Sequence, residues 1–406
     1  MAIEIRLVGP ELLDEFTSPL ISAFGMVPSA DRLDRFRGLP ELDTRIAAYD
    51  GKDIVGCAGS FAFDMSTSGG LTVPTAGLTM VGVNQTHRRQ GVLRSLMRAH
   101  LDGAFTRGQP IAALWASESS IYGRYGYGLA SFAMQLSIER DRSAFVGKDP
   151  PVVARFVDEA RAVEILPTVW EQARRFSPGM PSRSPTWWIK RRLIDNEIAR
   201  AGAGPLQRVV FTFDGQVEAY ALYRFRFAFD DAQLPAGTAH VVEAVGATPR
   251  GTRAALRYLC DLDLVTRVKM GNIPVDHPLF MLMEEPRRLH ATVIDALWVR
   301  IVDVSRALAA RRYPVADSLV FELEDAFCPW NTGRYRLDSG EARAQKTTEP
   351  ADLVFSASAL GSAYLGGISF ARMAEVGDVV EKSPGAVERA DRIFHTTRAP
   401  WCPEIF

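Results

Sequence analysis

The amino-acid sequence predicts an α/β (α+β) protein that contains the same strand–loop–helix unit twice. Strand and helix patterns alternate over the first 145 residues. A strand, a turn and an amphipathic helix in 240–262 repeat the order of elements in 78–101. Strands and short helices follow from residue 291 onwards. We therefore expect three domains, which a chain of 406 residues can accommodate: 1–145, 146–290 and 291–406.

The first region begins with β-strands and changes to a helical pattern near residue 91. Two strands are expected in 43–66, where Asp50-Gly51 favours a tight hairpin, and another strand in 70–86. Apolar residues then recur at helical spacing, which predicts a helix over 91–106. The nearly continuous apolar run in 111–117 predicts a strand that is buried on both faces.

The later regions contain a degenerate repeat of this unit and then a different kind of domain. Proline residues in 146–153 mark the junction to the second domain. The stretch 297–313 predicts a strand that leads into a short helix. We expect the last domain to serve packing and oligomerisation. Its hydrophobic end, "TRAPWCPEIF", is expected to be buried, with Trp401, Pro403 and Ile405 as its anchor.

Composition excludes several classes of function. The net charge of -1 and the pI of about 6.6 give no reason to expect nucleic acid or an anionic membrane as a partner. We find neither a signal peptide nor a run of apolar residues long enough to span a membrane. The four cysteines form no CxxC pair, and the six histidines are dispersed. We therefore expect a cytoplasmic protein with reduced thiols and no metal site.

The stretch "VGVNQTHRRQGVLRSLM" carries the clearest chemical signal. A strand runs into a loop with Arg88, Arg89 and Gly91, and a helix begins at once. Unpaired N–H groups and the positive dipole end make such a helix start suitable for a phosphate or pyrophosphate. The arginines add charge-assisted contacts, and the glycine allows close approach of the backbone. The spacing matches neither the Walker loop nor the dinucleotide fingerprint.

The stretch R-R-Q-G-V-L resembles the acetyl-coenzyme A loop of the GCN5-related N-acetyltransferases (GNAT superfamily), although Leu93 replaces the usual small residue. Together with "SESSIYGRYGYG", it resembles the Eis (enhanced intracellular survival) family in particular. The resemblance covers the whole chain. It implies a GNAT domain, a degenerate second GNAT-like domain, a C-terminal domain resembling sterol carrier proteins, and a homohexamer.

The resemblance also implies which residues bind acetyl-coenzyme A (acetyl-CoA). In the family, the pantetheine pairs with the strand that matches Val81, Gly82 and Val83. A splayed strand at this point could bond an extended amide ligand as if it were an added strand. The other residues expected to bind the coenzyme are Arg88, Arg89, Gln90, Gly91, Val92, Leu93, Arg94, Ser117 and Glu118.

By the same resemblance, Tyr122 is the general acid and the C-terminal carboxylate of Phe406 is the general base. The departing thiolate needs a proton, and an ammonium acceptor must lose one before it can attack. Tyr125 and Tyr127 remain alternatives for the acid, and Glu118 remains possible as the base. We expect direct transfer in a ternary complex, because Cys57 lacks a motif-linked histidine.

Family members acetylate aminoglycosides, lysine side chains or small arylalkylamines. The segment 22–39 is expected to form part of the acceptor pocket. Few carboxylates are expected there, which weakens the attraction for a polycation and favours a monoamine or a protein lysine. The expected pocket residues are Phe24, Met26, Phe36, Met80 and Glu404. The alternative function is a lipid or small-molecule carrier in which the GNAT motif is vestigial.

Overall fold

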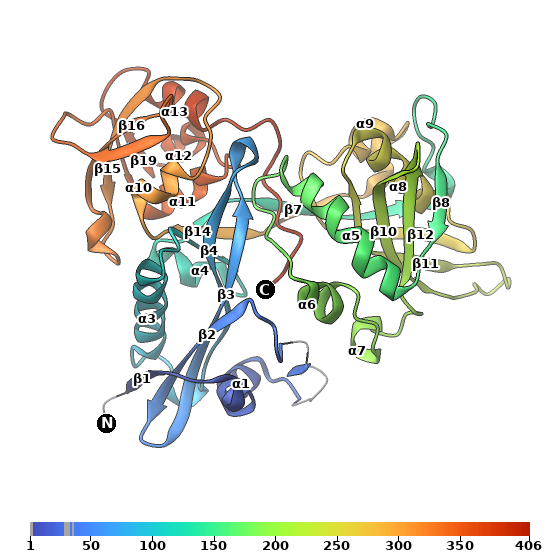
Figure 1. Ribbon diagram of the computed structural model, residues 1–406, viewed down its shortest axis with the longest axis horizontal. Helices are drawn as coiled ribbons and strands as arrows, with labels where there is room; N and C mark the ends of the chain where they lie inside the picture. Colours follow the sequence, from blue (N-terminus) through green and yellow to red (C-terminus); the bar gives the residue numbers. More distant parts are fainter. Residues whose placement is uncertain (1–2, 28–32, 35) are drawn as a thin grey trace. The chain divides into compact units, whose positions relative to one another are not determined.

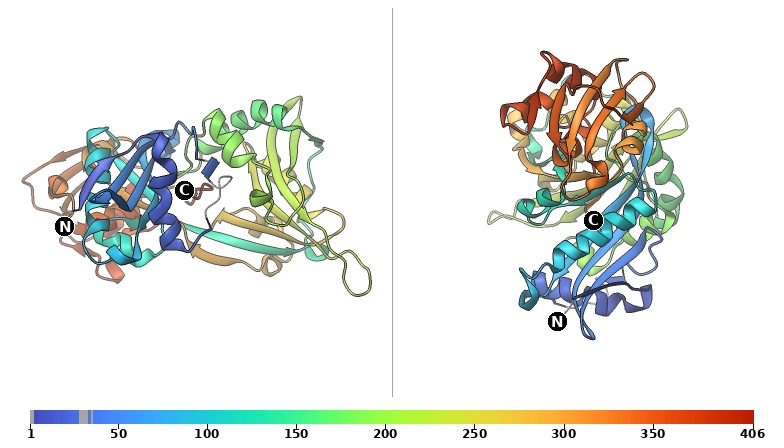
Figure 2. Two further views of the ribbon diagram at one scale, coloured as in Figure 1. Left: turned by 90° about the horizontal axis from the view of Figure 1, so that it is seen from below. Right: turned by 90° about the vertical axis from the view of Figure 1, so that its left-hand side faces the viewer.

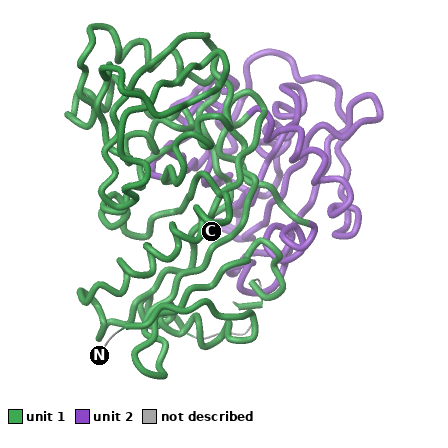
Figure 3. The backbone as a smooth tube through the Cα atoms, turned by 60° about the vertical axis from the view of Figure 1, so that its left-hand side comes forward, with its two compact units in different colours: residues 1–131, 177–184, 296–406 green, residues 132–176, 185–295 purple. Residues whose placement is uncertain are grey.

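The computed structural model describes residues 3–27, 33–34 and 36–406, which form two compact units (Figure 3). Unit 1 comprises residues 1–131, 177–184 and 296–406, and unit 2 comprises residues 132–176 and 185–295. The first and last domains expected from the sequence thus share one unit. The short segment 177–184, which lies in the middle of the chain, also belongs to that unit.

A seven-stranded sheet with the order β1-β2-β3-β4-β5-β14-β6 forms the first part of unit 1 (Figure 1). β4 and β5 are parallel, and the other neighbours are antiparallel. The expected hairpin at Asp50-Gly51 and the expected strands on either side of it are present. The strands are β1 (Glu4–Leu7), β2 (Leu42–Asp50), β3 (Asp53–Ser66), β4 (Thr72–Val83), β5 (Ile111–Trp115), β6 (Gly128–Leu129) and β14 (Leu297–Ile301).

Two helices cover opposite faces of this sheet (Figure 2). Helix α3 (Val92–Thr106), close to the predicted bounds, packs Leu96, Met97 and Leu101 into the core on one face. Helix α1 (Leu13–Phe24) lies against the other face, where a Cβ on Gly82 would come within 2.6 Å of the backbone of Leu20. The glycine therefore allows the backbone of α1 to approach β4 closely. A short helix, α4 (Ser119–Tyr122), follows β5.

The strand after residue 296 belongs to a different sheet from the one suggested by its place in the sequence. The sequence predicts 297–301 as part of the last domain, but β14 pairs with β5 from Leu297 opposite Trp115 to Ile301 opposite Ile111. It inserts between β5 and β6. Two apolar strands with paired backbones are stabilised wherever they lie in the chain, so sequence order does not reveal this pairing.

The C-terminal part of unit 1 is a five-stranded sheet with the order β17-β16-β15-β18-β19 and four helices. Aromatic rings fill its interior: Phe321 stacks on Tyr335 and Phe355 at 5.5 and 5.1 Å between ring centroids. The strands are β15 (Ser318–Glu324), β16 (Gly333–Asp338), β17 (Arg343–Lys346), β18 (Leu353–Ser356) and β19 (Val379–Glu381). The helices are α10 (Val304–Ala309), α11 (Ala357–Tyr364), α12 (Phe370–Glu375) and α13 (Ala386–Phe394).

Unit 2 repeats the mixed seven-stranded plan, with the order β13-β7-β12-β11-β10-β9-β8. The strand–turn–helix predicted from 240–262 is present as β11 and α8, and Thr248 caps the helix through the N–H of Gly251. The strands are β7 (Phe132–Glu139), β8 (Val153–Phe156), β9 (Gln207–Phe213), β10 (Gln216–Arg226), β11 (Gly237–Gly246), β12 (Val265–Pro274) and β13 (Thr292–Asp295). The helices are α5 (Glu159–Arg174), α6 (Pro185–Trp187), α7 (Glu197–Arg200), α8 (Pro249–Cys260) and α9 (Leu279–Leu282).

A buried histidine in α3 is expected to make the stability of unit 1 depend on pH. His100 is 1% exposed, and neither ring nitrogen has a hydrogen-bond partner among the described residues. Burial lowers its pKa from 6.5 to about 3. The unfolded chain therefore binds a proton below about pH 6.5 that the folded chain does not. Between about pH 7 and pH 5, unfolding should become easier by about 2 kcal/mol because of this group.

Urea unfolding of the wild type and of His100→Leu at the two pH values tests this expectation. The substitution should remove that part of the pH dependence. His395→Asn, at an exposed position, is the matched control and should leave the dependence as it is. An unchanged pH dependence in His100→Leu would contradict the assignment.

Candidate active site

The parallel strands β4 and β5 separate towards one end of the sheet. They pair only from Thr75 opposite Ile111 to Gly77 opposite Ala113. Beyond that point β5 pairs with β14, while β4 continues to Val83 along β3. This edge of β4 therefore has no strand partner after Gly77 in the described structure. The splayed strand expected from the sequence is present, and its backbone groups can pair with an extended amide ligand.

A β-bulge in β4 lies within this unpaired section. Met80 and Val81 stand opposite the single residue Ala58 of β3, and Met80 has a φ of +52°. The Cys57 thiol donates a hydrogen bond to the Met80 carbonyl at 3.2 Å. Bulges of this kind redirect the neighbouring side chains and end regular pairing. The local strain at Met80 thus accompanies the opening of the sheet.

A pocket of about 730 Å³ opens where the strands separate. Helix α3, helix α4 and the end of α1 contribute to its walls. Of the residues expected to bind the coenzyme, all but Gln90 line it; the Gln90 amide instead donates a hydrogen bond to the Thr86 carbonyl. The residues that line it are Ala23, Phe24, Val81, Gly82, Val83, Gln85, His87, Arg88, Arg89, Gly91, Val92, Leu93, Arg94, Ser117, Glu118, Ser120, Ile121, Tyr122, Arg124 and Tyr125.

The start of α3 provides a site for an anionic group in this pocket. Gly91 is the N-terminal cap residue with a φ of +84°, and no atom lies within 4 Å of the position where a Cβ would stand. Arg88 and Arg89 precede it and are exposed. The first N–H groups of a helix lack partners within the helix. Together with two guanidinium groups, they suit a pyrophosphate.

The tyrosines after β5 differ in their access to the pocket. Tyr122 and Tyr125 line it, whereas Tyr127 is fully buried and does not. Burial raises the pKa of Tyr122 to about 12, with smaller contributions from Tyr125 and Glu118. The Tyr122 phenol is therefore protonated at neutral pH and can act as a donor. The ring of Tyr127 packs edge-on against that of Tyr122 at 6.0 Å, which is a packing role.

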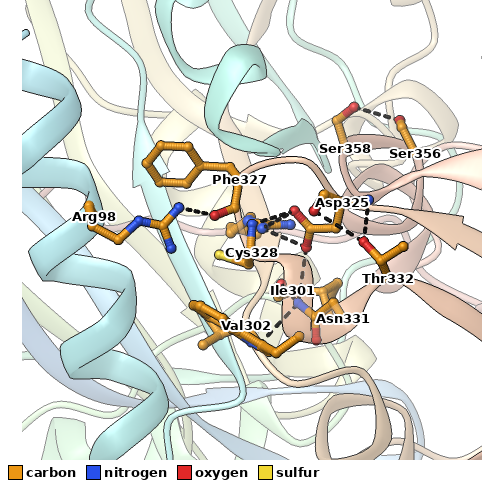
Figure 4. Close-up of polar contacts among 12 residues, drawn as sticks. Arg98, Ile301, Val302, Asp325, Phe327, Cys328, Asn331, Thr332, Ser356 and Ser358 are labelled. Atoms are coloured by element: carbon orange, nitrogen blue, oxygen red, sulfur yellow. Dashed lines mark hydrogen bonds and ion pairs between the residues drawn. The ribbon is translucent and has the colours of Figure 1, made fainter.

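The C-terminal domain contributes support that we did not predict. Phe327 packs on Tyr125 with 5.0 Å between ring centroids, and the guanidinium groups of Arg94 and Arg98 lie 5.3 and 4.0 Å from the Phe327 ring. Arg98 also donates a hydrogen bond to the Phe327 carbonyl (Figure 4). A wall of the pocket thus rests on a residue that is more than two hundred positions away in the sequence.

A buried ion pair holds the loop that carries Phe327. Arg300 in β14 contacts Asp325 at 2.7 Å, and both side chains are at most 1% exposed. Asp325 also accepts hydrogen bonds from the Cys328 N–H and the Asn331 amide, at 2.9 and 3.1 Å (Figure 4). One signal was available in the sequence: an arginine inside the apolar strand "LWVRIV" needs a buried acidic partner.

The C-terminal tail lies in unit 1, beside β3 and β4 (Figure 1). The Phe406 ring contacts those of Phe61 and Phe63, with centroids 6.3 and 5.1 Å apart. A Cβ on Gly77 would come within 3.2 Å of the Phe406 ring, so the glycine provides room for it. The Phe406 side chain is therefore packed against the strand that also borders the pocket.

The anchor of the tail differs from our expectation. Cys402 and Glu404 are the buried residues, at 1% and 4% exposure, whereas Ile405 is 61% exposed. The backbone N–H of Trp401 donates a hydrogen bond to the Pro178 carbonyl at 2.8 Å. Burial alternates along the tail, and the sequence did not show which alternate set would face inward. The prediction from hydrophobicity that Ile405 anchors the tail is therefore wrong.

The residues expected to form the acceptor pocket occupy different places. Phe24 is 52% exposed and lines the pocket, whereas Met80 is buried in the bulge. Phe36 stacks on Phe61 at 6.4 Å, which places it in the aromatic cluster around Phe406. Met26 follows the end of α1, and its N–H bonds to the Ile21 carbonyl at 3.0 Å. Residues 28–32 and 35 of the expected segment lie outside the described residues.

Glu404 is not available as a free charge in an acceptor pocket. Its carboxylate pairs with Arg183 at 2.5 Å, and the two side chains are 5% and 0% exposed.

Among the described residues we find no group of three or more metal-ligating side chains. No helix among the residues that the structure describes is both long and apolar enough to cross a membrane.

Comparison with known proteins agrees with this architecture. Residues 4–130 and 179–301 match family models described as acetyltransferase (GNAT) domains, and residues 304–403 match a sterol carrier protein domain. The fold, the splayed strands and the helix start therefore define an acyltransferase with two GNAT domains and a C-terminal domain of the sterol carrier protein type. GNAT domains use acetyl-CoA, and the pocket suits its extended amide chain and its pyrophosphate.

Individual relatives define the family. An uncharacterized N-acetyltransferase of Streptomyces coelicolor is 40% identical over the full length of both chains. The N-acetyltransferase Eis of Mycobacterium tuberculosis is 32% identical, over 86% of this chain and 85% of its own. The crystal structure of Eis1 from Mycobacterium abscessus matches the whole chain with a TM-score of 0.85 and 30% identity. The chain belongs to the Eis family of N-acetyltransferases.

Replacing both arginines of the loop is expected to weaken coenzyme binding. In Arg88→Ala/Arg89→Ala, the dissociation constant of acetyl-CoA measured by calorimetry should rise by about tenfold or more, because charge-assisted contacts are lost. The effect should shrink at high salt, since both side chains are exposed. Arg161→Ala, an exposed arginine of α5 in unit 2, is the control. Equal affinities in the two variants would contradict the role of the loop.

Proposed function

We propose that this protein transfers the acetyl group of acetyl-CoA directly to a primary amine in a ternary complex. The observation that carries the proposal is the pocket in unit 1, which brings the loop before α3, the open edge of β4 and Tyr122 together. Direct transfer requires only that the amine and the thioester are held in line. The candidate acceptor classes are aminoglycosides, lysine side chains and arylalkylamines.

In this mechanism two protein groups move protons. Acetyl-CoA supplies an acetyl group that is activated as a thioester. The C-terminal carboxylate of Phe406 takes a proton from the ammonium group of the acceptor, so that the free amine can attack. The Tyr122 phenol, which burial keeps protonated, donates to the sulfur as negative charge develops there. Each turnover converts an ammonium group and a thioester into an amide, a thiol and one free proton.

The surroundings of the tail favour an acceptor with one charge and an apolar body. The Phe406 ring contacts those of Phe61 and Phe63, and Phe36 in turn stacks on Phe61. The nearby Glu404 carboxylate is already paired with Arg183. Aromatic rings bind apolar groups and can also face a single ammonium group, whereas a polycation needs several free carboxylates. We therefore place arylalkylamines and lysine side chains before aminoglycosides.

Thiol release from acetyl-CoA, measured with a panel of amines, tests the function. The panel contains phenethylamine, a lysine peptide and an aminoglycoside, and mass spectrometry of the products confirms the transfer. We expect turnover with the first two and a lower kcat/KM for the aminoglycoside. Absence of turnover with every amine, together with absence of coenzyme binding by calorimetry, would overturn the proposal.

The alternative function as a lipid carrier has less support. In the C-terminal domain, Phe370 contacts Phe355 and Phe394, with ring centroids 5.5 and 5.1 Å apart, and so extends the stack on Phe321. These rings occupy the interior in which an apolar ligand would have to lie. Titration with a fluorescent fatty acid distinguishes the two functions, because a carrier should bind it at a 1:1 ratio.

We also propose that the protein is a homohexamer in the cytoplasm. The assembly is suggested by the family resemblance. The location is suggested by its four cysteines, which are buried and form no disulfide. Light scattering coupled to size exclusion measures the first, and fractionation of the native cells measures the second. A monomer at micromolar concentration would contradict the hexamer.

A further inference from the structure

The ion pair between Arg183 and Glu404 is among the most deeply buried in unit 1. The Arg183 side chain is 0% exposed and that of Glu404 is 5% exposed, with 2.5 Å between Nε and Oε1. Moving two charges out of water has a large desolvation penalty, and an apolar pair of similar size is often as stable. A buried ion pair therefore adds little net stability. What it does provide is a contact with a defined partner.

Arg183 belongs to a segment that is fixed to the central sheet. Residues 177–184 run beside the end of β3, where the N–H of Ser182 bonds to the Asp64 carbonyl and the N–H of Ser66 to the Met180 carbonyl, both at 2.9 Å. The Ser66 hydroxyl makes two further hydrogen bonds to this segment. The backbone that carries Arg183 is thus held by the same strand whose Phe61 and Phe63 contact the terminal ring.

Glu404 is well placed to fix the end of the tail. The backbone N–H of Trp401, five residues before Phe406, bonds to the Pro178 carbonyl, and Ile405 is 61% exposed. Packing of the Phe406 ring on neighbouring phenylalanines is non-directional. Glu404 lies two residues from the end, so its Cα can be at most about 7 Å from that of Phe406. A fixed Glu404 therefore restricts the terminal carboxylate to a small region.

We propose that Arg183 is a positioning residue for the transfer reaction. Through Glu404 it sets the place of the Phe406 carboxylate, without touching either substrate. This inference rests on the proposed role of that carboxylate as the base. It also explains why Glu404 is buried, since the charge of that residue serves the tail and not the acceptor.

The test compares Arg183→Met with the double variant Arg183→Met/Glu404→Met. The single variant leaves a buried carboxylate without this partner, and its melting temperature should fall. The double variant replaces the pair with apolar side chains and should regain most of the stability. If Arg183 positions the carboxylate, the double variant should still have a kcat about tenfold or more below that of the wild type at about pH 7. Its affinity for acetyl-CoA should remain within about twofold of the wild type.

The pH profile separates positioning from a general loss of structure. At about pH 10 the acceptor amine loses its proton without help from a base. The deficit of the double variant should therefore shrink to within about twofold at that pH. Arg192→Met, which breaks the ion pair with Glu243 in unit 2, is the matched control. It should lower the melting temperature without a pH-dependent change in kcat.

Two results would overturn the inference, and they are distinguishable. A stable double variant with wild-type kcat and an unchanged pH profile would show that the ion pair is only structural, while the role of the carboxylate would stand. Full turnover in a protein with residues added after Phe406 would remove the proposed base, and the positioning role would fall with it. A lowered kcat that recovers at high pH supports both.

Discussion

Adding a few residues after Phe406 is expected to lower turnover at about pH 7 by about 100-fold or more. The extension removes the carboxylate from its present position and places an amide there, which cannot accept a proton from an ammonium group. The pocket that we propose for the coenzyme is lined by other residues. The dissociation constant of acetyl-CoA should therefore change by less than about twofold. Steady-state kinetics with phenethylamine and calorimetry with acetyl-CoA measure the two quantities.

The same residues added at the N-terminus serve as the control, because they change length and composition equally. Deletion of Phe406 is a second comparison. It keeps a terminal carboxylate, but on Ile405, and removes the ring that packs on Phe61 and Phe63. We expect a loss of activity close to that of the extended protein. Normal turnover in the extended protein would transfer the role of base to Glu118 or to solvent.

Tyr122→Phe should have the second large effect, a decrease in kcat of about 100-fold. The substitution keeps the ring that packs against Tyr127 but removes the hydroxyl group that we propose as the proton donor to the sulfur. The KM for acetyl-CoA and the melting temperature should change little. Burial raises the pKa of Tyr122 to about 12, so the wild-type rate should not decline through this group between about pH 8 and pH 10.

Tyr125→Phe is the matched comparison, because Tyr125 also lines the pocket. Its hydroxyl group is expected to contribute less, so its kcat should fall less than that of Tyr122→Phe. Rates should be measured with an excess of amine, so that chemistry is compared and binding is not. A small effect in Tyr122→Phe with a large one in Tyr125→Phe would exchange the roles of the two residues.

Local patterns were sufficient to predict the elements around the proposed coenzyme site. The apolar residues that recur at helical spacing after Gly91 predicted α3, and the structure places the helix at Val92–Thr106. The glycine and the arginine pair were enough to indicate that the helix start suits an anion. The hairpin at Asp50-Gly51 was predicted in the same way. Each of these features depends on residues within one or two turns of one another, so a window of sequence contains the whole signal.

Contacts between distant segments followed no such pattern. The insertion of β14 between β5 and β6 joins residues that are well over one hundred positions apart. The pairing of Arg300 with Asp325 could be suspected from a lone arginine in an apolar strand, but its partner could not be named. No pattern in the sequence indicated that Phe327 would pack on Tyr125, because a phenylalanine in a loop is compatible with many neighbours.

The sequence by itself determined the class of the protein and predicted a coenzyme loop and a candidate acid, because those depend on short motifs with their own geometry. Only the tertiary structure decided how the last residues are held. The sequence showed an apolar tail, and hydrophobicity alone selected Ile405 as an anchor, yet that residue is 61% exposed. The buried residue is Glu404 instead, because it pairs with Arg183 of the segment 177–184. A buried charge needs a partner at a specific place, and that place exists only once the chain has folded.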